Sequence, residues 1–199
     1  MIGLNTVRQL NISTEDRIKQ IIVNLERCRW LPNETDGDYL VVNIPAYNLT
    51  VMHGDSLIFS CGVIVGKETN KTAIFKGYME NIVFNPYWNV PDKILKKEIL
   101  PLVAKNKNYL ADKHMEWYDG RLRQKPGEDN ALGEIKFLFP NPFDIYLHDT
   151  PAKGLFQEER RAFSHGCIRI SAPHQLAVYL LRGQPDWSPQ KMDETLSKG

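Results

Sequence analysis

The amino-acid sequence predicts a β-rich fold with flanking helices and an inserted segment of helices and loops, α+β overall. Short runs rich in β-branched and aromatic residues, bounded by turn residues, occur before and after the middle of the chain. Between them, at about residues 87–133, this strand pattern is lost. Helical periodicity is strongest near the two ends of the chain.

An amphipathic helix is predicted over residues 13–29. Its apolar positions recur at three- and four-residue steps: Ile18, Ile21, Ile22, Leu25 and Cys28. Ser13, followed three places later by Asp16, resembles a capping box, which satisfies amide donors at a helix start. Pro32 ends the helix, since proline cannot continue the hydrogen-bond pattern. Residues 13–33 therefore form a helix and linker.

Strand patterns follow this linker. The predicted strands span residues 39–44, 49–53, 57–65, 135–139 and 144–147. The sequence His53-Gly54-Asp55 has the turn chemistry expected between the second and third of these, which indicates a hairpin. We expect one domain over residues 34–172, which contains all five strands.

The segment 87–133 is aromatic, rich in lysine and punctuated by proline and glycine. Long irregular stretches within compact domains are often lids or binding loops, and a small helical subdomain is an equally good interpretation. Two C-terminal helices are predicted within residues 173–199. Ser171 is the expected cap of the first, Pro173 lies in its first turn and Gly183 ends it, while Ser188 begins the second.

Composition excludes several classes of function. The 199 residues, 42% of them hydrophobic, suffice for one good core, and 25 Lys and Arg against 24 Asp and Glu give a net charge of +1. This balance does not favour nucleic acid, a membrane surface or a polyanion as partner. No apolar run approaches the roughly 20 residues that span a bilayer, and the N-terminus lacks a signal-peptide pattern. We expect neither an anchor nor an export signal within this chain.

Reactive side chains gather on one face of two extended segments. Because side chains alternate along a strand, Tyr146 and His148 share a face in the first segment. The same alternation places three residues of the second segment on one side: His165, Cys167 and Arg169. The neighbouring aliphatic residues point the other way, so one face is core and the other carries chemistry.

Cys167 is the candidate nucleophile. A thiol with a pKa near ~8.5 is mostly protonated at neutral pH, so it needs a base or a positive neighbour. His165, His148 and Arg169 are the candidates, and we prefer His148, which lies on the preceding β segment. Its ring is oriented by a carboxylate such as Asp149 or by a backbone carbonyl, and both alternatives remain open.

Other uses of these residues are weaker. The other two cysteines, Cys28 and Cys61, fit the role of packed apolar residues, and three cysteines form no disulfide framework. Zinc-binding spacings such as C-x-x-C and H-E-x-x-H are absent, as are serine-hydrolase and phosphate-loop signatures. We expect no metal and no cofactor. A catalytically silent binding module, with Cys167 merely packed, is the alternative from another class.

A family resemblance adds to this reading. His148, fifteen further residues and then Ser164-His-Gly-Cys-Ile-Arg169 resemble the signature of the L,D-transpeptidase catalytic domain. Further stretches resemble its Gram-negative subfamily with a large capping insertion: residues 27–32, 42–47, 84–88 and 146–151. Residues 1–12, with Gly3-Leu-Asn-Thr6, are similar to the last helix of a peptidoglycan-binding module.

The resemblance implies a sandwich-like β fold and a two-step acyl transfer on peptidoglycan stem peptides. Cys167 would attack the third residue of a tetrapeptide stem and release D-alanine, and an amine of a second stem would resolve the thioester as a 3-3 cross-link. Water as acceptor would give an L,D-carboxypeptidase or cysteine peptidase on the same stems, and a lipoprotein lysine is a third acceptor. The catalytically silent alternative would then be a wall-binding module. The resemblance also implies a periplasmic location and covalent inhibition by carbapenem β-lactams.

The resemblance further implies roles for single residues. His148 would act as base, oriented by the backbone carbonyl of Asp149. The expected oxyanion donors are the amides of Gly166 and Cys167 and the hydroxyl of Tyr146.

Arg169 suits a substrate carboxylate, with an ion pair that holds its strand as the alternative. Ser164 and His165 would position the loop. Trp88 would line a peptide groove, together with other aromatic residues of the insertion: Tyr109, Trp117 and Tyr118.

Overall fold

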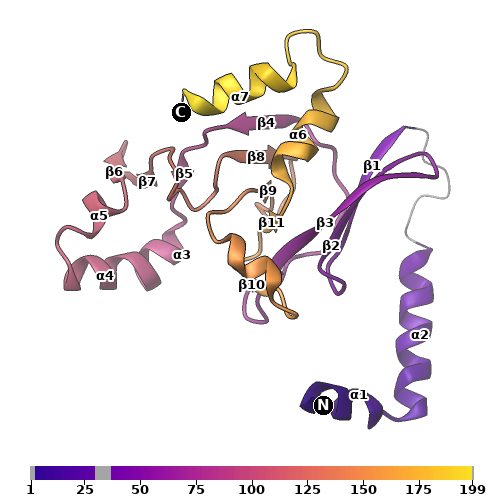
Figure 1. The fold of residues 1–199 in the computed structure, drawn as a ribbon. Helices are drawn as coiled ribbons and strands as arrows, with labels where there is room; N and C mark the ends of the chain where they lie inside the picture. Colours follow the sequence, from indigo (N-terminus) through magenta and orange to yellow (C-terminus); the bar gives the residue numbers. More distant parts are fainter. Residues whose placement is uncertain (1–2, 30–36, 199) are drawn as a thin grey trace. The chain divides into compact units, whose positions relative to one another are not determined.

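The structure is a computed structural model that describes residues 3–29 and 37–198 (Figure 1). Pro32, the predicted end of the first long helix, lies outside these residues. The chain divides into two compact units. One comprises Met1–Tyr39 and Met52–Ser56, and the other comprises Leu40–Val51 and Leu57–Gly199.

The first unit contains helices α1 (Leu4–Leu10) and α2 (Thr14–Cys28). The Ser13 hydroxyl accepts a hydrogen bond from the Asp16 amide at 3.1 Å, which confirms the predicted cap. Arg17 of α2 reaches back to the Gln9 carbonyl at 2.8 Å and so joins the two helices. No helix within residues 3–29 and 37–198 is long and apolar enough to cross a membrane.

The main sheet confirms the β-rich fold. Its order is β1-β2-β3-β11-β9-β8-β4, with β10 paired to β3. The strands are β1 (Asp38–Asn43), β2 (Asn48–His53), β3 (Ser56–Gly66), β4 (Asn81–Phe84), β8 (Ile135–Leu138), β9 (Leu147–His148), β10 (Ala162–Ser164) and β11 (Ile168–Ile170). β11 runs parallel to β9 and antiparallel to β3, so the sheet is mixed.

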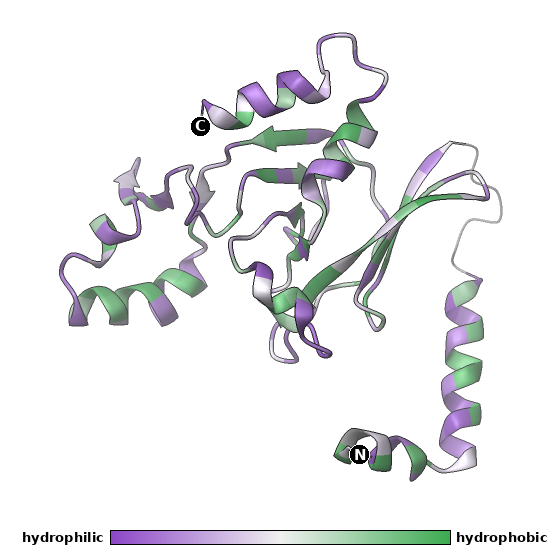
Figure 2. Ribbon diagram, in the orientation of Figure 1, coloured by the Kyte–Doolittle hydropathy of each residue, from purple (hydrophilic) through white to green (hydrophobic). Residues whose placement is uncertain are grey.

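The principal core lies along β3, β8, β9 and β11, whose apolar residues stand out in Figure 2. Helices α6 (Pro173–Leu181) and α7 (Pro189–Ser197) add Leu176 and Met192 to this core. The Trp187 ring stacks on Phe84 of β4 at 4.9 Å between centroids. A short 3₁₀ helix, η2 (Lys153–Gln157), precedes β10.

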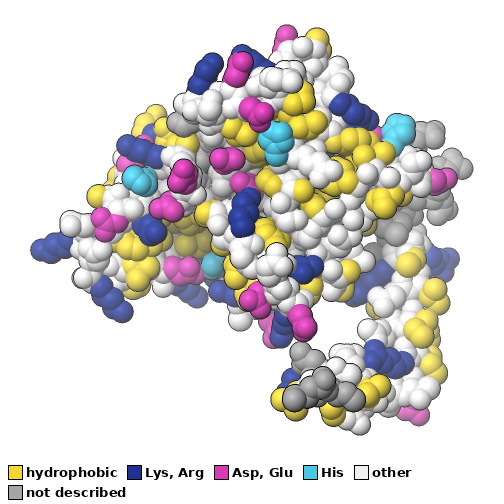
Figure 3. Space-filling model, in the orientation of Figure 1, with side chains coloured by type: hydrophobic (Ala, Val, Ile, Leu, Met, Phe, Trp, Pro, Cys, Tyr) yellow, Lys and Arg dark blue, Asp and Glu magenta, His cyan; other side chains and the backbone are white. Residues whose placement is uncertain are grey.

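On the face drawn in Figure 3, side chains of both charges are interspersed, in keeping with the net charge of +1.

Three local predictions need correction. Cys28, predicted to be a packed apolar residue, is exposed at the end of α2, whereas Cys61 is buried as predicted. Ser171 does not cap α6, because its amide bonds the Gly62 carbonyl beside β11 and the N-cap is Ala172. The predicted strand 144–147 is β9, which begins only at Leu147. The Asn141 side chain causes this difference: its Oδ1 accepts from the Ile145 amide at 3.1 Å and its Nδ2 donates to the Ile145 carbonyl at 2.7 Å, which holds the chain in a loop.

The segment within 87–133 forms a small subdomain with an apolar cluster of its own. Its elements are β5 (Trp88–Asn89), α3 (Asp92–Ile94), the π-helix η1 (Leu95–Ile99), α4 (Leu100–Lys105), α5 (Tyr109–Asp112), β6 (Met115–Tyr118) and β7 (Arg121–Gln124). The strands pair as a sheet of order β5-β7-β6, and the buried residues of the cluster are Val90, Ile99 and Leu122. Sequence patterns missed this sheet because its strands are short and two of them, β6 and β7, carry charged residues.

Candidate active site

Three basic side chains cross the main sheet in one row. The Cα partner of His148 in β9 is Lys136 of β8 on one side and Arg169 of β11 on the other. Residues paired in this way project from the same face of a sheet. Tyr146 lies beside this row, with its ring centroid 5.6 Å from that of His148.

Cys167 lies at the end of a tightly held loop that precedes β11. Its sulfur is 3.6 Å from the Asp144 carbonyl oxygen, and the side chain is partly buried. The Ser164 hydroxyl accepts from the Gly166 amide at 3.1 Å and donates to the Cys167 carbonyl at 2.5 Å. Thr72 donates to the Gly166 carbonyl at 2.8 Å. Gly166 has a φ of 124°, which favours glycine, so the loop depends on this residue type.

His165 does not follow the predicted alternation. The strand begins only at Ile168, after the turn at Gly166, so the face of His165 is not set by the strand. Its Nε2 lies 2.6 Å from the Glu98 Oε1 atom of η1. His165 therefore connects the loop that carries Cys167 to the inserted subdomain.

The geometry around His148 distinguishes its two candidate partners. Nδ1 lies 2.5 Å from the backbone carbonyl oxygen of Asp149, which makes Nδ1 the protonated atom and leaves a lone pair on Nε2. The Asp149 carboxylate instead accepts from the Glu134 amide and pairs with Lys153. Burial, reinforced by the charge of Arg169, lowers the pKa of His148 to about 3, so its ring is neutral at neutral pH.

The thiol is also neutral at rest. Burial raises the pKa of Cys167, although hydrogen bonds from Tyr146 and the charge of Lys136 act in the opposite direction. Burial raises the pKa of Tyr146 as well, so its hydroxyl remains a donor. The buried Nε of Arg169 has no hydrogen-bond partner in the part of the chain that the structure describes. The arrangement is a neutral thiol and imidazole beside a donor hydroxyl and a partly buried cation.

Residues 37–185 match the family model for YkuD, the L,D-transpeptidase catalytic domain. The chain belongs to this family. A Haemophilus influenzae protein described as a candidate L,D-transpeptidase is 33% identical over 207 residues, which cover 93% of this chain and 42% of that protein. This L,D-transpeptidase domain thus spans less than half the length of that relative.

A solved L,D-transpeptidase from Mycobacterium smegmatis is also similar. It matches with a TM-score of 0.42 and 17% sequence identity, over 72% of this chain and 54% of that chain. As a family, L,D-transpeptidases act on peptidoglycan stem peptides.

Not every predicted residue of the L,D-transpeptidase domain joins the row beside Cys167. Trp88 pairs with Gln124 in the small sheet and packs on the cluster around Leu122. Its described contacts therefore lie within the subdomain. Across residues 3–29 and 37–198, no group of three or more His, Cys, Asp or Glu side chains is placed to hold a metal ion.

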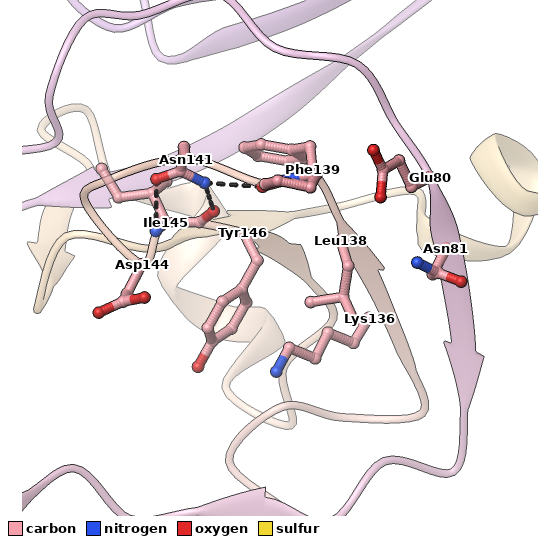
Figure 4. Close-up of a pocket in the computed structure, with 10 residues that line it drawn as sticks. Glu80, Asn81, Lys136, Leu138, Phe139, Asn141, Asp144, Ile145 and Tyr146 are labelled. Carbon is pink, nitrogen blue, oxygen red and sulfur yellow. Dashed lines mark hydrogen bonds between the residues drawn. The ribbon is translucent and has the colours of Figure 1, made fainter.

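Sequence reasoning missed Lys136 and Asp144. Alternation along β8 could have identified Lys136, because its neighbours Ile135 and Phe137 are apolar and buried, which leaves Lys136 on the opposite face. Both missed residues line a pocket of about 390 Å³ next to Tyr146 (Figure 4). Two of its lining residues, Asp144 and Tyr146, also contact the Cys167 thiol.

Proposed function

We propose that this domain is the catalytic part of a peptidoglycan L,D-transpeptidase that forms 3-3 cross-links. It would act in the periplasm on tetrapeptide stems and release D-alanine through a Cys167 thioester. The main support is the arrangement of Cys167, Tyr146 and a neutral, carbonyl-bound His148 in a domain of this family. The pocket lined by Asp144 and Tyr146, both of which contact Cys167, would receive part of a stem peptide.

The first step is attack of the Cys167 sulfur on the carbonyl carbon of the third stem residue. Because thiol and imidazole are both neutral, the thiol proton moves to His148 Nε2 as the carbon–sulfur bond forms. Collapse of the tetrahedral intermediate breaks the amide bond. The imidazolium is strongly acidic in this environment and protonates the departing amine of D-alanine.

The second step reverses this order with a new nucleophile. An amine from a second stem attacks the thioester carbonyl, and neutral His148 accepts its proton. The carbon–sulfur bond then breaks, and the proton returns to Cys167. The products are the cross-linked stems and the original neutral pair.

Oxyanion stabilisation is assigned to the Cys167 amide and to the Tyr146 hydroxyl, which donates to the sulfur at rest and would turn to the oxyanion as the carbon–sulfur bond forms. The amide of Gly166 donates to Ser164, so it is already engaged. The Cys167 amide makes no hydrogen bond within the described residues and remains able to donate. One such donor contributes about 3 to 4 kcal/mol to transition-state stability. Arg169, whose Nε lacks a partner among the described residues, would bind a substrate carboxylate.

The decisive experiment uses a purified disaccharide-tetrapeptide as the sole substrate, with products identified by mass spectrometry. Wild-type protein should yield cross-linked dimers and free D-alanine. Cys167→Ala should yield neither, whereas Cys28→Ala, which removes an exposed thiol, should retain activity. Tripeptide without dimers would replace this proposal by an L,D-carboxypeptidase, and unchanged substrate would overturn both.

Carbapenem acylation gives an independent test of the nucleophile. Meropenem should add one covalent mass to the wild-type protein and to Cys28→Ala. The Cys167→Ala variant should keep its unmodified mass. An adduct that persists in Cys167→Ala would place the reactive group elsewhere.

A further inference from the structure

Lys136 is a charged residue at the site that the proposed steps do not use. It lies on β8 directly opposite His148, on the sheet face that also carries Arg169. The residues on either side of it, Ile135 and Phe137, are buried in the core. Its backbone position is therefore fixed on both sides by packing.

The ammonium group of Lys136 lies against Tyr146. Its Nζ atom is 3.9 Å from the centroid of the Tyr146 ring, a cation–π contact. Figure 4 shows the Lys136 amine and the Tyr146 hydroxyl directed to the same side of the pocket. The pocket also contains two carboxylates, Glu80 and Asp144, but neither pairs with Lys136 within 4.0 Å among the described residues. A partly buried ammonium is thus held by an aromatic ring rather than by an anion.

We propose that Lys136 is a positioning residue whose charge, held against Tyr146, increases the reactivity of the Cys167 thiol. This inference rests on the proposed function only in taking Cys167 as the nucleophile. A cation over the ring draws electron density from the phenol, which makes the Tyr146 hydroxyl a stronger donor to the sulfur. The same charge attracts the thiolate that forms during attack, and this attraction is stronger in a partly desolvated site than in water.

Few of the groups around Cys167 can stabilise its thiolate by their charge. Asp144 opposes a thiolate, and the Tyr146 hydroxyl supports it. His148 is neutral above a pH of about 3 and so adds no charge at neutral pH. Arg169 is the other cation of the row. Burial lowers the pKa of Lys136 and raises the pKa of Cys167. The attraction between the Lys136 ammonium and the Cys167 thiolate opposes both of these shifts.

The test measures thiol reactivity directly. Alkylation of Cys167 by iodoacetamide is followed by peptide mass spectrometry from pH 6 to 10 in wild type, Lys136→Gln and Lys136→Arg. In Lys136→Gln the apparent thiol pKa should rise by about one unit, which slows alkylation at lower pH about tenfold. Lys136→Arg, which keeps the charge, should stay close to wild type. The exposed Cys28 is an internal reference whose rate should not change.

Three results would overturn the inference. An unchanged profile in Lys136→Gln would show that the charge does not act on the thiol. A shift of equal size in Lys136→Arg, at wild-type thermal stability, would assign Lys136 to packing. If Lys136→Gln fails to fold, Lys136→Met replaces it, and an unchanged profile there counts equally against the inference. A shifted profile in a protein that cross-links no stems would instead refute the proposed function and leave this inference standing.

Discussion

Among single residues, Thr72 has the clearest structural role in holding the Cys167 loop. Its hydroxyl accepts from the Gly66 amide at 2.9 Å and donates to the Gly166 carbonyl at 2.8 Å. Thr72→Val keeps the shape but leaves both backbone groups without this partner, so unfolding free energy should fall by about 1 to 3 kcal/mol. Urea denaturation measures this loss. Thr72→Ser, which retains the hydroxyl, should lose much less, and equal losses in both would refute the hydrogen-bond explanation.

His148 predicts a dependence of stability on pH. Burial lowers its folded-state pKa to about 3, below the unfolded value of about 6.5. Between these values the unfolded chain binds a proton that the folded chain does not, so stability is complete above pH 6.5 and falls as pH decreases toward 3. The full effect would be several kcal/mol, on the order of 1.4 kcal/mol per pKa unit. Denaturation in urea at a series of pH values from 7 to 4.5 measures it.

The control for this prediction separates His148 from the carboxylates, which also titrate in acid. His148→Gln removes the imidazole and leaves every carboxylate in place. The slope of unfolding free energy against pH should therefore be smaller in this variant over pH 5 to 6.5. Parallel slopes in the two proteins would mean that His148 does not carry the effect.

Whole elements differ in how well sequence patterns predict them. Helix α2 and strands β1 to β3 follow apolar periodicity and turn residues, so their positions were predictable. The loop before β9 was not, because the Asn141 side chain replaces strand pairing there. Likewise, the sequence did not show that Lys136 lies opposite His148. That position depends on the pairing of β8 with β9, which strand patterns within one segment do not determine.

The contact between η1 and the Cys167 loop predicts how the subdomain is held. Glu98 of η1 meets His165 at 2.6 Å, and both side chains are partly exposed, so the pair contributes about 1 kcal/mol or less to stability. Glu98→Ala should leave thermal stability nearly unchanged but speed amide hydrogen exchange in η1 and α4. Lys97→Ala, an exposed neighbour, is the matched control. Equal exchange in all three proteins would show that this contact does not hold the subdomain.

Across the molecule, the site depends on the main sheet, while the subdomain has a core of its own. The row formed by Lys136, His148 and Arg169 belongs entirely to strands of the main sheet. The sequence indicated the proposed nucleophile and base through a motif that resembles those of a known family. It could not show that Gly166 is engaged by Ser164, because that contact depends on how the loop folds.

Two separate apolar clusters predict two levels of unfolding. Leu122 is 1% exposed in the subdomain cluster, and Ile170 is fully buried in the main core. Leu122→Ala removes about 2 to 5 kcal/mol of packing. If the subdomain opens as a local unit, this loss should speed hydrogen exchange in β5, β6 and β7 and leave β3, β8 and β11 protected. Ile170→Val, a smaller deletion in the main core, should speed exchange in β3, β8 and β11. Uniform acceleration of exchange in Leu122→Ala would mean that the subdomain and the main sheet unfold as one unit. If the pH profile of Cys167 alkylation is unchanged in that variant, the site forms without an intact subdomain.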